Sequence, residues 1–127
     1  MTISEKLLSE KNGSFKELEI SQNTAEKLGT IEKSELPEDY KDFVEQIGFG
    51  EVGDGWFMLY SGIVLADEIF GEEVEELKEL YFFGDDMQGI HAAIDKRTNT
   101  IVEVDSSDMS ILKVSSSFTS YMENLIY

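Results

Sequence analysis

The sequence predicts an α+β fold in which a mainly antiparallel central sheet is flanked by N-terminal and C-terminal helices. Two amphipathic helical patterns, one after Pro37 and one near the C-terminus, enclose a run of short strand-like segments. The connections between these segments are short and rich in glycine, aspartate and serine, which is typical of antiparallel hairpins. Because the 127 residues contain no repeat and no low-complexity linker, we expect a single domain covering residues 1–127.

The helix after Pro37 has the clearest start signal in the chain. Proline presets the first helical φ, and Glu38 and Asp39 occupy the first turn, where the helix dipole favours anions. Gly48 and Gly50 predict the helix end, because glycine tolerates the left-handed backbone of a helix stop. The apolar residues of this helix recur at helical spacing and form one stripe: Tyr40, Phe43, Val44 and Ile47.

The residues before Pro37 predict only short elements. Ser4 is a suitable cap for a helix over residues 5–10, with Leu7 and Leu8 facing inward. A capping-box spacing predicts a second short helix over residues 24–28.

Strand patterns follow the glycines. The aromatic run 56–60 predicts a strand, Ser61-Gly62 predicts a turn, and residues 63–65 predict a second extended piece. Residues 81–83 form another aromatic strand, which we expect to end at Gly84-Asp85-Asp86.

Residues 90–95 and 100–105 alternate between apolar and polar side chains and predict a hairpin with a four-residue polar loop. We expect Val102 and Val104 on a buried face, with Glu103 and Asp105 on a wet one.

Residues 111–114 predict a short edge strand, and Ser115 or Ser116 is expected to cap the last helix. The clearest amphipathic stripe in the chain belongs to that helix: Phe118, Tyr121, Met122, Leu125 and Ile126.

The net charge is the most informative bulk property. Ten basic residues against 27 acidic ones give −17 and a pI near 4.2. Nucleic acid and anionic membranes are disfavoured as partners, because binding them depends on cations. A basic protein partner is favoured, since opposite charge steers association. The alternative is that the charge serves solubility alone. The chain has no cysteine, no apolar run long enough to span a membrane and no secretion signal, so we expect a cytoplasmic protein.

The glutamate-rich residues 71–80 predict a short exposed helix or helical turn with an anionic outer face. Either this face is simply solvated, or it docks a basic partner. An exposed aromatic residue ringed by carboxylates is a suitable binding hot spot, although most aromatic side chains must lie in the core. The candidate partner-binding residues are Glu72, Glu73, Glu75, Glu76, Asp85, Asp86 and Trp56.

The residues of this chain give less support to an enzymatic function. His91 is the only histidine, and it lies in an alternating strand, which favours an ordinary sheet-face histidine over a general base. Asp85 and Asp86, with Asp95, could hold Mg²⁺, but adjacent aspartates after Gly84 are also turn formers. We therefore predict a protein that is not an enzyme, with no catalytic residue, no cofactor and no metal site.

The order of these signals resembles the SMI1/KNR4 superfamily, also called SUKH. The segments that carry the resemblance are LPEDYKDFVEQIGFG at 36–50, the Trp56 strand, residues 83–89, the strand ending at 101–105 and the helix that opens at Ser117-Phe118. Bacterial members of this family are mostly immunity proteins, so the resemblance implies a protein that neutralises a cognate polymorphic toxin of the nuclease or deaminase class. The alternatives are a regulatory scaffold for endogenous proteins, as in fungal relatives, and a metal-dependent hydrolase. The resemblance leaves the toxin and the oligomeric state open.

Overall fold

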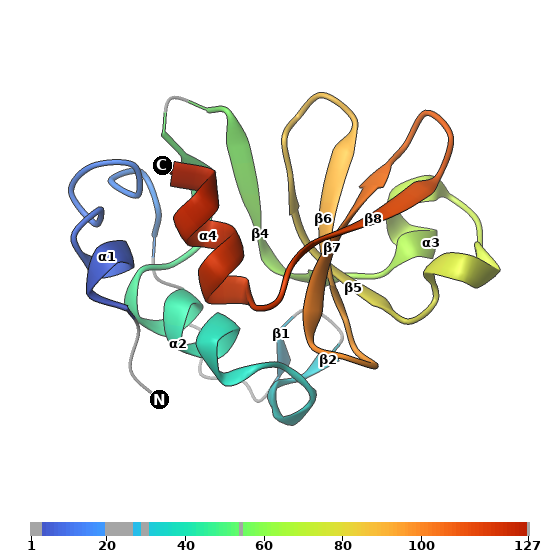
Figure 1. The fold of residues 1–127 in the computed structure, drawn as a ribbon, viewed down its shortest axis with the longest axis horizontal. Helices are drawn as coiled ribbons and strands as arrows, with labels where there is room; N and C mark the ends of the chain where they lie inside the picture. The colour runs from blue at the N-terminus through green and yellow to red at the C-terminus, as the bar shows by residue number, and fades with distance from the viewer. Residues whose placement is uncertain (1–3, 20–26, 29–30, 54, 127) are drawn as a thin grey trace.

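A computed structural model describes residues 4–19, 27–28, 31–53 and 55–126. It confirms the α+β class: a six-stranded antiparallel sheet in the order β3-β4-β5-β6-β7-β8 is flanked by helices (Figure 1). The strands of this sheet are β3 (Gly50–Val52), β4 (Phe57–Val64), β5 (Leu80–Asp85), β6 (Ile90–Asp95), β7 (Thr100–Asp105) and β8 (Ser110–Ser115). The α-helices are α1 (Glu5–Leu8), α2 (Glu38–Gln46), α3 (Ala66–Phe70) and α4 (Phe118–Ile126). Two 3-10 turns, η1 (Lys33–Glu35) and η2 (Glu75–Leu77), and a small hairpin of β1 (Lys27–Leu28) and β2 (Ile31–Glu32) complete the described elements.

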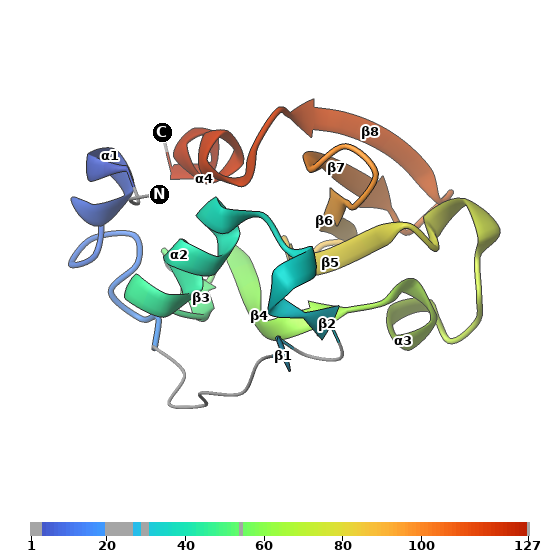
Figure 2. The ribbon, with the colours of Figure 1, turned by 90° about the horizontal axis from the view of Figure 1, so that it is seen from below.

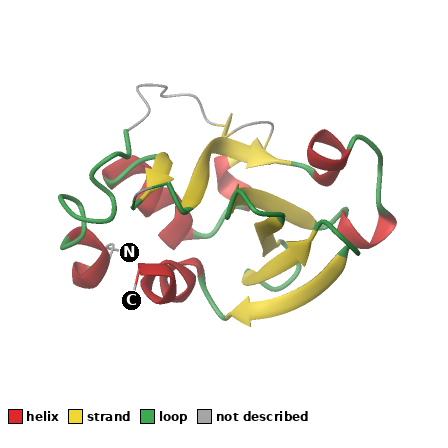
Figure 3. Cartoon of the chain, turned by 90° about the horizontal axis from the view of Figure 1, so that it is seen from above, coloured by secondary structure: helices red, strands yellow, loops and turns green. Residues whose placement is uncertain are grey.

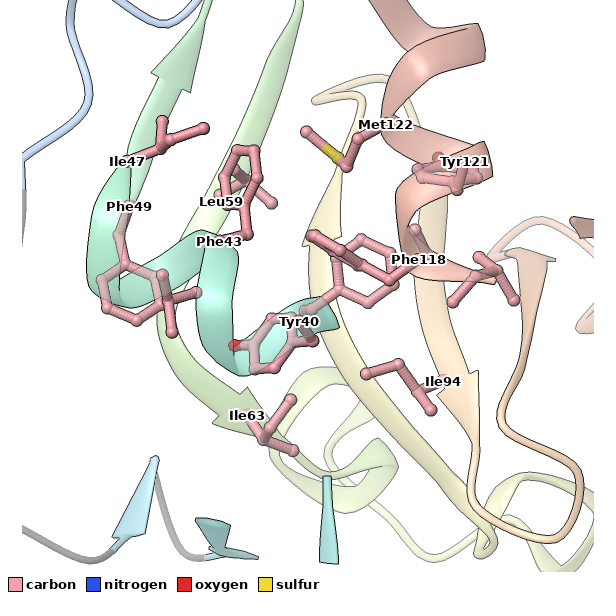
Figure 4. Packing of buried hydrophobic residues seen from close by; sticks show 14 of the residues in the cluster. Tyr40, Phe43, Ile47, Phe49, Leu59, Ile63, Ile94, Phe118, Tyr121 and Met122 are labelled. Carbon is pink, nitrogen blue, oxygen red and sulfur yellow. The ribbon is translucent and has the colours of Figure 1, made fainter. Parts of the chain in front are cut away.

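Helices α2 and α4 pack side by side on one face of the sheet, which we call the helix face (Figure 2). The predicted stripe of α2 is confirmed, because Tyr40, Phe43, Val44 and Ile47 are all buried. The ring of Phe118 in α4 lies 5.1 Å from that of Tyr40 and 5.4 Å from that of Phe43, both edge-on (Figure 4). Such edge-to-face pairs add to the free energy that burial alone supplies.

The cap of α4 differs from the prediction. The hydroxyl of Ser117, not that of Ser115 or Ser116, accepts the backbone N–H of Ser120 at 3.1 Å. The predicted stripe of this helix is confirmed, since Phe118, Tyr121 and Met122 are buried and the two later apolar residues pack against them. The helix starts later than predicted because β8 continues through Ser115.

The opposite face of the sheet, which we call the acidic face, carries a smaller apolar cluster beneath α3 and η2 (Figure 3). Val102 and Val104 are buried there, as predicted. The expectation that Glu103 lies on a fully wet face is wrong, because the side chain is half-buried beside α4 and its carboxylate accepts the Tyr121 hydroxyl at 3.0 Å. Both faces of the sheet are therefore covered, and simple alternation did not distinguish them.

Strand β4 is continuous, so the predicted turn at Ser61-Gly62 is wrong. The pairing of β4 with β5 shifts register between Leu59 and Val64, and a β-bulge of this kind bends a strand without ending it. Strands β4 and β5 approach each other closely at Gly84. A Cβ atom at this position would lie 2.4 Å from the carbonyl oxygen of Met58, so glycine is required there. Turn-forming residues inside a strand thus mark a bend here.

The N-terminal prediction is confirmed only in part. Ser4 caps α1 by accepting the backbone N–H of Leu7 at 3.2 Å, but the helix ends at Leu8, which is 38% exposed. Lys27–Leu28 is a strand and not the end of a helix; the rest of the predicted element, apart from these two residues, lies outside the described residues. Among the described helices, none combines the length and the apolar character that crossing a membrane requires.

Candidate partner-binding surface

The acidic segment, residues 66–79, wraps over the acidic face of the sheet. It begins with α3, reverses direction at Gly71, whose φ of 78° is left-handed, and ends just after η2. Apolar side chains anchor it: Ala66 and Leu77 are buried, and Ile69, Phe70 and Val74 pack against the same cluster. The segment contains one basic residue, Lys78, and these acidic residues: Asp67, Glu68, Glu72, Glu73, Glu75, Glu76 and Glu79.

The four predicted binding glutamates of this segment are all exposed. They lie around a helical turn, as predicted, but the turn is the 3-10 element η2. Glu75 forms an ion pair with Lys78 at 2.7 Å, and this hydrogen bond raises the pKa of Lys78. Within the described part of the chain, no basic side chain pairs with the other three: Glu72, Glu73 and Glu76. Their charges are free to act on a partner.

A hollow of about 200 Å³ lies between α3 and the glutamates. Its apolar lining comes from Leu65, Ala66 and Val74, and its polar lining from the acidic segment. Small-molecule sites are usually larger, about 300–1,000 Å³. The hollow therefore fits a side chain of a partner better than a cofactor.

Asp85 and Asp86 shape the turn between β5 and β6. One carboxylate oxygen of Asp85 accepts the backbone N–H of Met87 at 2.7 Å. One oxygen of Asp86 accepts the backbone N–H groups of Gln88 at 2.8 Å and Ile90 at 3.0 Å. These are the bonds expected of turn-forming aspartates, which was the alternative to magnesium binding.

Asp95, the third carboxylate of the hypothetical magnesium site, lies at the opposite end of the strand pair. It is the register partner of Leu80, whereas Asp85 is the register partner of His91. Its carboxylate instead binds the Arg97 guanidinium at 2.9 Å, and the hydrogen bond from Arg97 lowers the pKa of Asp95. Over the described ranges, no group of three His, Asp or Glu side chains is placed to hold a metal ion.

A polar cluster on the acidic face joins Tyr60, Asp85 and His91. The Tyr60 hydroxyl donates to Asp85 Oδ2 at 2.5 Å and lies 3.3 Å from His91 Nδ1. Burial, with the Asp85 carboxylate beside it, raises the pKa of Tyr60. Sequence reasoning missed this cluster, because the cluster depends on the register of three strands. Alternation along each strand can place a residue on a face, but it does not show which residues of neighbouring strands meet.

His91 lies on the sheet surface between aromatic rings, as expected of a sheet-face histidine. Its ring centroid is 5.3 Å from that of Phe70, which is the last residue of α3, and 6.3 Å from that of Phe82, both edge-on. Through Phe70, the polar cluster is linked to the start of the glutamate run at Glu72. The Phe70 ring thus joins the polar cluster to the apolar side of the acidic segment.

Trp56 lies apart from the glutamates. It precedes β4, in the turn after β3, and is 42% exposed. The indole lies over Gly53, where an added Cβ would be 1.7 Å from Trp56 Nε1, so no larger residue fits there. Because Met58 is the register partner of Asp85, Trp56 lies at the same end of the sheet as the two aspartates. The seven candidate residues therefore fall into two groups: the four glutamates, and Trp56 with Asp85 and Asp86.

The family model SUKH_6, described as SMI1-KNR4 cell-wall, matches residues 26–122 of the chain. This range contains α2, the entire six-stranded sheet and the first half of α4. No curated protein and no solved structure matched the chain.

Proposed function

The chain belongs to the SMI1/KNR4 (SUKH) superfamily, and from this premise we propose that it is a non-catalytic immunity protein that binds and masks a basic toxin in the cytoplasm. The superfamily includes immunity proteins. A nuclease or deaminase that acts on nucleic acid must be basic where it holds phosphates, so a strongly anionic protein can cover that surface.

One observation carries the proposal. The glutamates of the acidic segment are exposed, while apolar side chains of the same segment pack against the sheet. The exposed Glu72, Glu73 and Glu76 form no ion pair with the described basic side chains, while Val74 and Leu77 hold the same stretch against the sheet. An interface needs this combination, since charge speeds the encounter and a fixed backbone keeps the ordering cost low.

The charge of the whole chain is also asymmetric. Residues 1–41 contain six lysines and nine acidic residues, whereas residues 42–127 contain four basic and 18 acidic ones. A basic partner is therefore drawn toward the sheet and the acidic segment more than toward the N-terminal part.

The test is a binding measurement with the product of the gene next to this one, co-purified and then separated. Changing Glu72, Glu73, Glu75 and Glu76 together to Lys is expected to slow association by at least about tenfold at low salt, because steering is electrostatic. Unfolding by urea is expected to be almost unchanged, since all four side chains are exposed.

The matched control reverses four exposed acids outside the segment: Glu5, Glu17, Glu19 and Glu51. It changes the net charge by the same amount. If both variants slow association equally, net charge alone is responsible and the acidic segment is rejected as the site. If the wild-type protein and the neighbouring gene product do not bind at all, the immunity proposal is rejected.

A further inference from the structure

The two edges of the six-stranded sheet are not equivalent. At one edge, β3 has only three residues, and Phe49 just before it pairs with Glu19. At the other edge, β8 has six residues, none of them buried, and β7 is its only strand partner among the described elements. Figures 2 and 3 show β8 running along the outside of the molecule. An edge strand of this kind leaves a row of backbone N–H and C=O groups without partners in the sheet.

Strand β8 also exposes apolar side chains. Leu112 is 65% exposed and Ile111 is 43% exposed, and Leu112 is the most exposed large hydrophobic residue in the described chain. Natural edge strands are usually protected by several charges, by proline or by being very short. Strand β8 contains one charge, Lys113, and no proline. The edge is therefore suited to pairing with another strand.

Acidic groups lie on both faces of the sheet that β8 closes. On the acidic face, Ile111 is the register partner of Val104, which belongs to the same apolar cluster as Val74 and Leu77 of the acidic segment. On the helix face, Leu112 is the register partner of Glu103. A hollow of about 220 Å³ lies beside the second half of β8, between Val114, Glu103 and α4. A strand added to β8 would direct its alternate side chains toward these two acidic regions.

We propose that the basic partner docks by adding an extended segment to β8, so that the sheet gains a seventh strand whose Lys and Arg side chains approach the acidic segment and Glu103. This inference rests on the proposed function and specifies its binding mode. Charge favours a basic segment over a second copy of this chain. A second copy would bring together two proteins of charge −17 each. Main-chain hydrogen bonds supply affinity in strand addition, and the alternate side chains supply specificity.

A six-residue peptide with basic side chains on both faces of its strand tests the proposal without the toxin: acetyl-Lys-Arg-Val-Val-Lys-Arg-amide, titrated at millimolar concentration into the ¹⁵N-labelled protein. We expect chemical-shift changes centred on residues 110–115 and amide exchange there slowed on the order of tenfold, because new main-chain hydrogen bonds protect those groups. Two control peptides separate the contributions. One has its alternate amides N-methylated, which blocks pairing and keeps the charge, and the other has glutamate in place of Lys and Arg.

Binding of the first peptide with loss of binding by both controls supports the proposal. Equal binding of the N-methylated peptide would show that charge alone attracts the peptide and would overturn strand addition. Shifts confined to the acidic segment, or no shifts, would also overturn it. If dilution alone changes the shifts of residues 110–115, the edge pairs with a second copy and the proposal is wrong.

Substitutions then connect the edge to the natural partner. Leu112→Asn and, separately, Ile111→Thr are expected to weaken binding of the peptide and of the neighbouring gene product at least about fivefold, since exposed apolar contacts are lost. The matched control is Leu8→Asn, which removes an apolar side chain of 38% exposure from α1, at the end of the molecule opposite to β8 (Figure 1). A partner that binds wild type and both β8 variants equally would reject strand addition while leaving the immunity proposal intact.

Discussion

The helix face and the acidic face of the sheet are covered by different kinds of structure. The helix face lies under two nine-residue helices, and its core includes fully buried rings such as Phe43, Phe83 and Phe118. The acidic face lies under a five-residue helix and a 3-10 turn, whose apolar side chains Ile69, Phe70 and Val74 are only partly buried. One face thus supplies most of the stability, and the other holds a thin charged segment in place. Surfaces that bind partners are often of the second kind.

Removing one aromatic ring from each face tests whether the two faces differ in the stability that they supply. Phe43→Ala is expected to lower the free energy of unfolding by about 3–5 kcal/mol, because a fully buried ring in contact with Phe15 and Phe118 leaves a cavity. Phe70→Ala on the acidic face is expected to cost roughly half as much, since Phe70 is only partly buried. Urea unfolding measures both. Equal losses would mean that the acidic face is as much a core as the helix face.

A second prediction compares one tyrosine hydroxyl on each face. Tyr121→Phe leaves the half-buried Glu103 carboxylate without its donor and is expected to cost about 1–2 kcal/mol. Tyr60→Phe is expected to cost less, about 0.5–1 kcal/mol, because Asp85 keeps its bond from the Met87 backbone. Thermal unfolding followed by circular dichroism compares the two variants. The reverse order would show that the polar cluster of the acidic face is a structural centre.

The smallest expected effect concerns pH and the ion pair at the end of β6. The Arg97 hydrogen bond lowers the pKa of Asp95 below its ordinary value of 3.8. Since the lowered pKa belongs to the folded state, the pair stabilises the protein above that ordinary value. This contribution is lost as pH falls through the folded-state pKa. Arg97→Ala is expected to raise the pKa of Asp95 and to lower the stability only slightly near neutral pH, because the Arg97 side chain is 67% exposed.

Carboxyl chemical shifts followed through an acid titration measure the pKa of Asp95 in both proteins. Below the pKa of Asp95 in both states, wild type and Arg97→Ala are expected to have the same stability. An unchanged pKa would show that the backbone bond from Arg97 to Asp95 Oδ1, at 3.0 Å, suffices without the guanidinium.

Elements with strong local patterns could be predicted from the sequence. The stripes of α2 and α4 and the bounds of β6 and β7 are confirmed, because periodicity and flanking turn residues are local properties. The predictions are wrong where contacts between residues distant in the sequence determine the local structure. Ser61-Gly62 looks like a turn but continues β4 because β5 pairs on both sides of a bulge. Ser115 extends β8 because β7 pairs with it, so the cap moves to Ser117.

The arrangement of the candidate binding residues in space could be predicted less well than the fold. The glutamates of the acidic segment are exposed as expected, since charge density alone favours solvent. The glutamates are separated in space from Trp56, Asp85 and Asp86. This separation follows from the register of β4 and β5, which the sequence does not specify. The exposed edge β8 was placed correctly as an edge strand, but only the structure shows that Ile111 and Leu112 remain uncovered.

The sequence by itself determined the fold class, the two amphipathic helices, the family and the strong negative charge, because each is encoded in composition or short-range order. The tertiary structure decided which carboxylates are available to a partner. Asp39, for example, was expected only to favour the start of α2, yet its Oδ2 atom also accepts the backbone N–H of Thr119 at 2.9 Å and so joins α2 to α4. A carboxylate carries the same charge wherever it lies, but its neighbours, which can come from anywhere in the chain, fix whether it caps a helix, shapes a turn or faces a partner.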